Sequence, residues 1–298
     1  LLGMKKSIYY WSPCLNKVGT VKSTLNSAIS LAKYSSTYDV KILNVFGEWS
    51  EYKNYLKKKN VEVENLTFNY YNLLPKNGFV QSRFSYLIIF FISLIPLILF
   101  FKKKKPSYFI IHLITSLPLI LLNVLGLKSR IILRISGFPK LNFVRKFFWR
   151  IAFKKIHLVT CPTLNTLNYI KNLKLIDSSK LKLLYDPIIE INEINKKKSE
   201  KFELSDYYLS VGRLTKQKNF LFLFEGFRKI VEINNKVKLF IAGNGEQENE
   251  LKKFIYKNNL SKNIFLLGYV ENIYPYLKNA KGFISTSLWE DPGIVLIE

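Results

Sequence analysis

Ser285–Glu298 reads STSLWEDPGIVLIE and carries two carboxylates, Glu290 and Glu298, eight residues apart. Eight residues exceed two helical turns, so one helix would not bring the two side chains together. Gly293 stands between them and allows a loop to precede a helix. We therefore expect Glu290 on a loop and Glu298 on the helix that follows. Carboxylate oxygens accept hydrogen bonds, which suits them to ribose and hexose hydroxyls.

A cationic stretch precedes this acidic one. Val211–Asn219 reads VGRLTKQKN, with Arg213 and Lys218 five residues apart. Arginine and lysine are suited to a diphosphate, the first as a planar fork of donors and the second as a point charge. Asn219 tolerates a left-handed backbone and can cap the helix expected to start at Phe220. The two stretches together predict both halves of a nucleotide-sugar site.

Two glycine-bearing motifs lie between these stretches and complete an ordered set. They are Ala242–Gly245, AGNG, and Phe265–Val270, FLLGYV. In this order, the four pieces resemble the C-terminal domain of retaining family 4 glycosyltransferases, which have the GT-B fold. The resemblance extends over the whole chain and is most specific from Tyr207 to Glu298.

The resemblance implies a role for each motif residue. Glu290 is expected at the donor sugar as the catalytic carboxylate, and Glu298 at the ribose hydroxyls. Arg213 and Lys218 would contact the diphosphate. The backbone of Gly293, Ile294 and Val295 would face phosphate or sugar oxygens at the start of the last helix. No protein nucleophile, metal or cofactor is implied, because the nucleotide-sugar is the substrate and the leaving phosphate can accept the proton.

The first half offers weaker candidates. Gly19 follows the first expected strand, where the family brings backbone close to phosphate or acceptor; it also fits a plain turn. Many family members place a histidine after a middle strand, and here Ser136 and Gly137 stand in that stretch. His112 ends the preceding strand and either serves the cleft or is a satisfied core or strand-end histidine. Asn244, in the AGNG motif, completes the possible cleft residues.

Strand and helix signals alternate along the chain, which predicts an α/β protein with two parallel sheets. We predict two Rossmann-like domains facing across a cleft, over residues 1–190 and 206–298, with a linker over residues 191–205. Motifs that follow strands should gather at the carboxyl edge of each sheet. We expect the natural protein to start at Met4 and to continue past Glu298, which leaves the second domain incomplete here.

The predicted elements are the following. Strands are expected over residues 7–11, 40–46, 61–68, 108–113, 130–135, 157–161, 182–185, 207–211, 237–242, 264–267 and 282–286. Helices are expected over residues 20–34, 51–59, 84–102, 117–125, 141–154, 164–173, 220–233, 246–258 and 273–278.

Composition narrows the functional classes. The net charge of +25 is uneven: residues 1–190 hold 29 Lys and Arg against 8 Asp and Glu. A basic half suits an anionic partner such as a lipid surface or a phosphorylated substrate, although a lysine-rich codon bias also raises the charge. Cys14 and Cys161 indicate neither a disulfide framework nor a zinc site. No G-x-S-x-G or Asp-x-Asp motif occurs, and no nucleic-acid-binding motif accompanies the charge.

The apolar run Tyr86–Phe101, YLIIFFISLIPLILFF, precedes four lysines, Lys102–Lys105. Three interpretations remain open. The run is a buried or partly buried helix, an interfacial helix anchored by the lysines, or a transmembrane helix. Sixteen residues are short for a span, and Pro96 interrupts them.

These features predict a cytoplasmic enzyme, peripheral on the inner face of the membrane. It would move a sugar from a nucleotide-diphosphate donor to an acceptor hydroxyl with retention. The expected acceptor is a lipid-linked saccharide, as in surface-polysaccharide or O-antigen assembly, and nucleic acid is not an expected partner. Two alternatives stay open: a non-catalytic glycosyltransferase-like subunit, and a nucleic-acid-binding protein that uses the basic first half.

Overall fold

The structure is a computed structural model of the chain. It describes residues 5–15, 19–75, 79–112, 116–135, 139, 142–187, 189–290 and 293–297. The chain folds as two compact units, residues 1–188 and 189–298. Ser136, Gly137 and Glu298, named above as site residues, lie outside the described residues.

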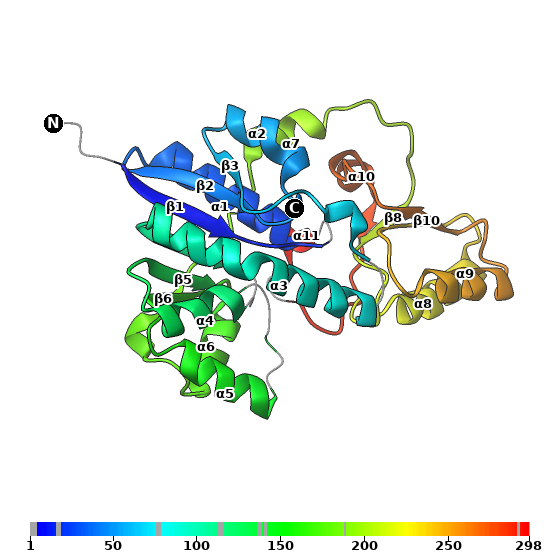
Figure 1. Cartoon of the computed structure of the whole chain (residues 1–298). Helices are drawn as coiled ribbons and strands as arrows, with labels where there is room; N and C mark the ends of the chain where they lie inside the picture. Colours follow the sequence, from blue (N-terminus) through cyan, green and yellow to red (C-terminus); the bar gives the residue numbers. More distant parts are fainter. Residues whose placement is uncertain are drawn as a thin grey trace. The chain divides into compact units, whose positions relative to one another are not determined.

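Unit 1 is built on a parallel sheet with helices on both faces (Figure 1). In the described residues its strand order is β3-β2-β1-β4-β5-β6-β7. The strands are β1 (Lys6–Trp11), β2 (Tyr38–Asn44), β3 (Glu62–Asn65), β4 (Tyr108–His112), β5 (Arg130–Arg134), β6 (Leu158–Cys161) and β7 (Leu181–Leu183). The helices are α1 (Gly19–Tyr34), α2 (Lys53–Lys58), α3 (Phe79–Lys104), α4 (Ser116–Leu125), α5 (Phe143–Ala152) and α6 (Leu164–Asn172).

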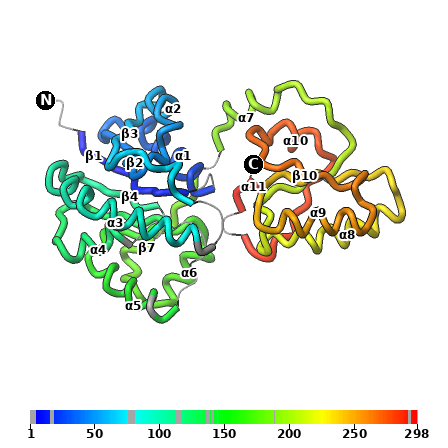
Figure 2. Tube along the Cα trace, turned by 45° about the vertical axis from the view of Figure 1, so that its right-hand side comes forward, coloured from blue at the N-terminus to red at the C-terminus, as the bar shows by residue number. Residues whose placement is uncertain are grey.

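Two hydrophobic clusters show which helices cover which face of this sheet. Residues of α1 and α2, such as Ala28 and Leu56, pack with Ile8 and Ile42 of the strands. Residues of α3, α4, α5 and α6 pack against the other face, as Figure 2 also shows, and Trp149 of α5 belongs to that cluster. Because both faces are covered, the central strands read as nearly continuous apolar runs rather than as alternating ones.

Unit 2 repeats this plan on a smaller scale. Its parallel sheet has the order β10-β9-β8-β11 in the described residues, with α8 and α9 packed on one face and α10 on the other. The elements are α7 (Ile191–Lys197), β8 (Tyr208–Val211), α8 (Phe220–Ile233), β9 (Leu239–Ala242), α9 (Glu248–Lys257), β10 (Ile264–Gly268), α10 (Tyr274–Asn279), β11 (Gly282–Phe283) and α11 (Ile294–Ile297).

The predicted class of α/β protein with two Rossmann-like parallel sheets is confirmed, and three local predictions need correction. The expected linker contains α7, whose last turn is tied to unit 2 because Asn272 Nδ2 donates to the carbonyl of Lys197 at 3.0 Å. The last strand is short, since only Gly282 and Phe283 pair with β8. The apolar helix α3 begins at Phe79 and runs for 26 residues, longer than predicted.

The face that α3 buries explains how it fits this unit. Ile89 and Leu97 lie in the core, whereas Phe91, Ile95 and Leu99 are exposed on the opposite side. The helical stretch of residues 81–104 is long and apolar enough to cross a membrane, by length and composition only, and one third of its apolar 18-residue window is buried. Of the three interpretations, a partly buried helix matches the packing, and its exposed apolar side keeps the interfacial one open.

Candidate functional site

The strand order of unit 2 places two loops next to each other at the carboxyl edge. The sheet reverses its direction of growth between β8 and β11, and ligands bind at such switch points outside the carboxyl ends of parallel strands. The loop of residues 212–219 follows β8, and the stretch of residues 284–290 follows β11. The predicted cationic and acidic motifs therefore meet at the switch point.

An ion pair joins the two motifs. Lys218 Nζ lies 2.5 Å from Glu290 Oε1, across 72 residues of chain. Both side chains are largely shielded, with 15% and 26% of their surfaces exposed. An ion pair with restricted solvent contact is screened less than one at an open surface. The pair holds the carboxylate of Glu290 at the mouth of the loop that also carries Arg213.

Three hydrogen bonds fasten the two stretches beside this ion pair. Gln217 donates from Nε2 to the carbonyl of Trp289 at 2.9 Å, and its own carbonyl accepts from the amide of Leu288 at 2.9 Å. Thr286 Oγ1 donates to the carbonyl of Lys218 at 3.1 Å. We did not predict Gln217 or Thr286 as site residues, because nothing local in the sequence pairs them. Their contacts fix where Lys218 and Glu290 point.

Asn219 ends the loop and begins α8. Its backbone is left-handed, with φ of 55°, as the sequence suggested for an asparagine at this point. Its side chain makes no capping hydrogen bond, so the predicted cap is wrong in that respect. The first amides of the 14-residue helix α8 therefore face the end of the loop, where a helix N-terminus favours negative charge.

Glycines let two strand-end loops, those after β8 and β9, pack closely. A Cβ on Gly243, whose φ is 144°, would lie 1.9 Å from the carbonyl oxygen of Gly212. A Cβ on Gly245 would lie 2.3 Å from the carbonyl oxygen of Leu214. The side chain of Lys218 covers Gly212, and a Cβ on Gly212 would lie 3.0 Å from Lys218 Cε. The backbone of the AGNG motif thus packs directly against the backbone of the cationic loop.

Gly243→Ala should therefore displace the cationic loop. We expect a loss of about 1–3 kcal/mol in the free energy of unfolding, because alanine is strained at this φ and meets the Gly212 carbonyl. Urea unfolding of the variant measures it. Gly226→Ala is the matched control, since Gly226 lies inside α8 with open space around its Cα. That change should stabilise the protein by about 0.5–1 kcal/mol. Equal effects of the two changes would contradict the packing argument.

The other predicted residues of unit 2 are placed as follows. Arg213 is exposed, and within the described part of the chain no carboxylate pairs with it. Asn244 is exposed, and its carbonyl accepts the amide of Leu214 at 3.0 Å. Gly293 has φ of 70° and its Cα lies against the Glu290 side chain, directly before Ile294 and Val295 in α11. The structure thus brings Lys218, Glu290 and Gly293 together.

In unit 1 the two predicted residues that the structure describes, Gly19 and His112, stand at or near the carboxyl edge. Gly19 is exposed and is the first residue of α1. His112 ends β4 and has no exposed surface, and neither ring nitrogen has a hydrogen-bond partner among the described residues. His112 is therefore a buried strand-end histidine, as the second interpretation had it, although the described residues supply no hydrogen bond to its ring. Burial and the nearby Arg134 charge lower the pKa of His112 to about 3.

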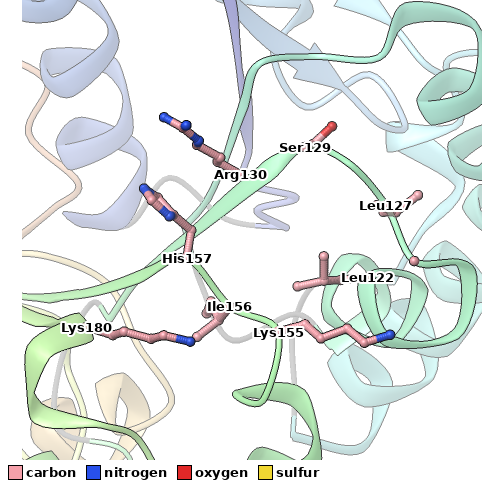
Figure 3. Close-up of a pocket in the computed structure, with 9 residues that line it drawn as sticks. Leu122, Leu127, Ser129, Arg130, Lys155, Ile156, His157 and Lys180 are labelled. Atoms are coloured by element: carbon pink, nitrogen blue, oxygen red, sulfur yellow. The ribbon is translucent and has the colours of Figure 1, made fainter.

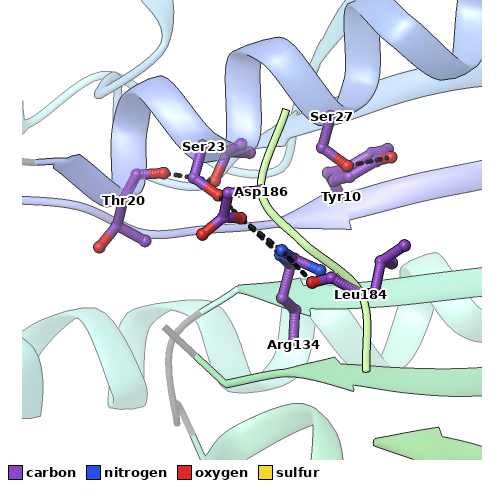
Figure 4. Close-up of polar contacts among 8 residues, drawn as sticks. Tyr10, Thr20, Ser23, Ser27, Arg134, Leu184 and Asp186 are labelled. Atoms are coloured by element: carbon purple, nitrogen blue, oxygen red, sulfur yellow. Dashed lines mark hydrogen bonds and ion pairs between the residues drawn. The ribbon is translucent and has the colours of Figure 1, made fainter. Parts of the chain in front are cut away.

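A buried polar network at this edge was not predicted. Arg134, at the end of β5, donates to Asp186 Oδ1 from Nε at 2.8 Å and from Nη2 at 2.5 Å, and to the carbonyl of Leu184 at 2.9 Å (Figure 4). Ser23 of α1 donates to the same carboxylate oxygen. Both charged side chains are 3% exposed. The network ties the segment after β7 to β5 and α1.

The fold and the loops at the switch point define the class of protein: a GT-B glycosyltransferase fold. Residues 191–298 match the family of glycosyl transferases group 1, so the chain carries a glycosyl transferases group 1 domain. The predicted resemblance is confirmed to this extent.

Curated relatives and solved structures agree with this assignment. An N-acetylgalactosamine-N,N'-diacetylbacillosaminyl-diphospho-undecaprenol 4-alpha-N-acetylgalactosaminyltransferase of Campylobacter jejuni is 30% identical over 188 residues, 60% of this chain and 50% of that protein. A UDP-Gal:alpha-D-GlcNAc-diphosphoundecaprenol alpha-1,3-galactosyltransferase of Escherichia coli is 38% identical over 96 residues, 30% of this chain and 24% of that protein. The matches span half or less of these relatives. The crystal structure of TarM superposes with a TM-score of 0.72 at 16% identity, over all of this chain and 83% of that one, which shows the fold alone.

Proposed function

We propose that this protein is a retaining glycosyltransferase that moves a sugar from a nucleotide-diphosphate donor to a hydroxyl of a lipid-linked saccharide. The observation that carries the proposal is the Lys218–Glu290 ion pair at the switch point of unit 2. The two motifs that supply a cation and a carboxylate are far apart in sequence and adjacent in space. A non-catalytic protein with the same fold would not require both the cation and the carboxylate.

The chemistry follows from the charges of this loop cluster. Negative charge grows on the diphosphate as the sugar–phosphate bond breaks, and Arg213, Lys218 and the α8 N-terminus would stabilise it. Positive charge grows on the sugar, and the Glu290 carboxylate would stabilise that. We propose that these side chains suffice without a metal, so turnover should persist in EDTA. The backbone at Gly293 would contact donor oxygens, and Glu298 would bind the ribose.

Arg213→Ala is expected to weaken nucleoside-diphosphate binding by about 1.5–3 kcal/mol, because one charge-assisted hydrogen-bonding group is lost. This corresponds to roughly a 10- to 150-fold rise in Kd. Calorimetry with UDP, GDP and ADP measures it and also selects the base. Lys216→Ala is the control, since Lys216 is an exposed cation of the same loop outside the motif. An equal loss of nucleoside-diphosphate affinity in both variants would show that Arg213 contributes only its positive charge and no specific contact.

The proposal of a lipid-linked acceptor rests on unit 1 and on the two relatives whose names include an undecaprenol-linked substrate. Helix α5 exposes Phe143, Phe147 and Ile151, spaced by four residues on one side, with exposed surfaces of 85%, 59% and 41%. The exposed apolar side of α3 belongs to the same helix layer. Exposed apolar rings beside cations are typical of helices that lie in a membrane interface. We propose that this layer docks on the cytoplasmic face of the membrane, where a lipid-linked acceptor resides.

Phe91→Ser combined with Phe147→Ser should reduce binding to anionic vesicles at least 10-fold, because burying one phenylalanine contributes about 1.5–3 kcal/mol. Cosedimentation with phosphatidylglycerol vesicles measures the change. Phe222→Ser is the matched control: Phe222 is 67% exposed on α8 of unit 2. High salt should also release the wild-type protein in part. Unchanged sedimentation of the double variant would leave α3 and α5 as ordinary surface helices.

A further inference from the structure

A basic pocket lies at the amino edge of the unit 1 sheet, away from the strand-end loops described above. Its volume is about 470 Å³, and it is lined by the last turn of α4, the loop to the start of β5, the segment between α5 and β6, and Lys180 before β7 (Figure 3). Four of the lining side chains are basic: Arg130, Lys155, His157 and Lys180. Leu122 and Ile156 contribute apolar walls. No carboxylate is among the described residues that line it.

Neutral groups, rather than acids, contact three of these side chains, Arg130, Lys155 and His157. Arg130 Nη1 donates to the hydroxyl of Tyr108 at 2.9 Å, and its guanidinium lies 5.6 Å from the centre of that ring. Lys155 Nζ donates to the carbonyl of Asn123 at 3.0 Å. The His157 ring lies 6.3 Å from that of Tyr108. Their positive charges therefore remain uncompensated by these contacts.

The absence of acids is a property of a long stretch of sequence. Between Glu64 and Asp177 the chain has 17 lysines and arginines and no aspartate or glutamate. This stretch includes α3, α4 and α5 and all but one of the basic pocket residues. Partial burial, and then the charges of Arg130 and Lys180, lower the pKa of His157.

We propose that the Arg130–Lys155–His157–Lys180 pocket binds a phosphate group. Arginine and lysine donors around one cavity match the several acceptor oxygens of a phosphate, and an anion would relieve the repulsion among the four side chains. The phosphate can come from a lipid headgroup or from a soluble phosphate compound. The position of the pocket favours a lipid headgroup, because Val124 and Leu125 at the end of α4 are exposed beside the pocket residues Leu122 and Gly126. The pocket contains none of the proposed donor-binding residues of unit 2, so a negative result for phosphate binding would not contradict the proposed sugar transfer.

The two histidines of the chain make the test direct. Histidine NMR should show the pKa of His157 rising by about one pH unit when inorganic phosphate binds, because a nearby anion favours the charged imidazole. His112 is fully buried and serves as the internal reference. Sodium chloride at matched ionic strength controls for screening. The affinity for phosphate is read from the same titration.

Variants assign the effect to the pocket. Arg130→Gln with Lys180→Gln should raise the Kd for phosphate at least 10-fold and abolish the rise in the His157 pKa. Lys229→Gln with Lys257→Gln removes the same charge from exposed positions of unit 2 and should change neither. Lys155→Gln is a second, single probe of the pocket. Thermal unfolding of each variant verifies that the fold persists.

Vesicles distinguish the two sources. Phosphatidylcholine vesicles with and without phosphatidylglycerol are compared by cosedimentation. Weaker binding of the pocket variant than of the charge-matched control to the anionic vesicles identifies a lipid headgroup. Equal vesicle binding, together with a phosphate effect on His157, identifies a soluble phosphate compound. If phosphate leaves the His157 pKa where sodium chloride does, the proposal is overturned.

Discussion

Glu290→Gln is expected to lower kcat for sugar transfer by roughly 10²–10³-fold, the effect of removing one preorganised electrostatic group from a reacting centre. Glutamine keeps the size and one acceptor oxygen of Glu290 but loses the charge that would face the positively charged sugar. The Lys218 ammonium, 2.5 Å from this carboxylate, also loses its partner. Initial rates with a panel of UDP-, GDP- and ADP-sugars, with and without EDTA, measure the change.

The split between kcat and KM separates two roles of this carboxylate. If Glu290 acts on the sugar, kcat falls and nucleoside-diphosphate affinity is nearly kept. If it only positions Lys218, the KM for the donor rises and kcat is nearly kept. Glu246→Gln is the matched control, because Glu246 is an exposed acid of another strand-end loop in the same unit. A Glu290→Gln enzyme with wild-type kcat would remove this residue from the catalytic site.

Arg134→Met is expected to cost about 3–5 kcal/mol in the free energy of unfolding of unit 1, because it leaves the Asp186 carboxylate buried without its cation. Both side chains are 3% exposed, so water cannot replace the lost partner. The double change Arg134→Met with Asp186→Leu should recover much of that loss, because it removes the buried charge as well. Ser23→Ala removes one hydrogen bond to the same carboxylate and should cost about 1 kcal/mol.

Tryptophan fluorescence during urea unfolding follows this effect in unit 1, which contains Trp11, Trp49 and Trp149. The second unit has only Trp289, so separate transitions can be recognised. Glu62→Gln is the control, since it breaks the Lys41–Glu62 ion pair, whose carboxylate is 61% exposed, and should cost under about 1 kcal/mol. Similar losses for the exposed and the buried pair would contradict the role given to burial.

The loops at the switch point of unit 2 were predictable because their signals are local. A strand followed by glycine and a cation, or by AGNG, can be read from a few adjacent residues. The sheet order then brings such loops to one edge, as parallel strands require. Gln217 and Thr286 were missed for the opposite reason: their partners are backbone carbonyls and amides of a stretch far along the chain. No local residue pattern predicts a hydrogen bond to a backbone group far along the chain.

The helix layer of unit 1 shows the same difference between what the sequence predicted and what the packing decided. The apolar run and its lysines predicted a helix near the membrane or in the core, and both ideas depended on which side of α3 is covered. Lys104 is also not a free anchor, because it pairs with Glu64 at 2.8 Å. The exposed Phe147 on α5 was not predicted, because a phenylalanine on a helix is by default expected in the core.

By itself, the sequence determined the alternation of strands and helices, the parallel sheets and the order of the glycine, cation and carboxylate motifs, because periodicity and turn residues act within a few positions. Only the tertiary structure decided that Lys218 pairs with Glu290, that Arg134 meets Asp186, and that His112 is buried against the segments around it. Those contacts join residues that the chain separates by tens of positions. Their energies depend on strand order and burial, which are properties of the packed molecule rather than of any segment.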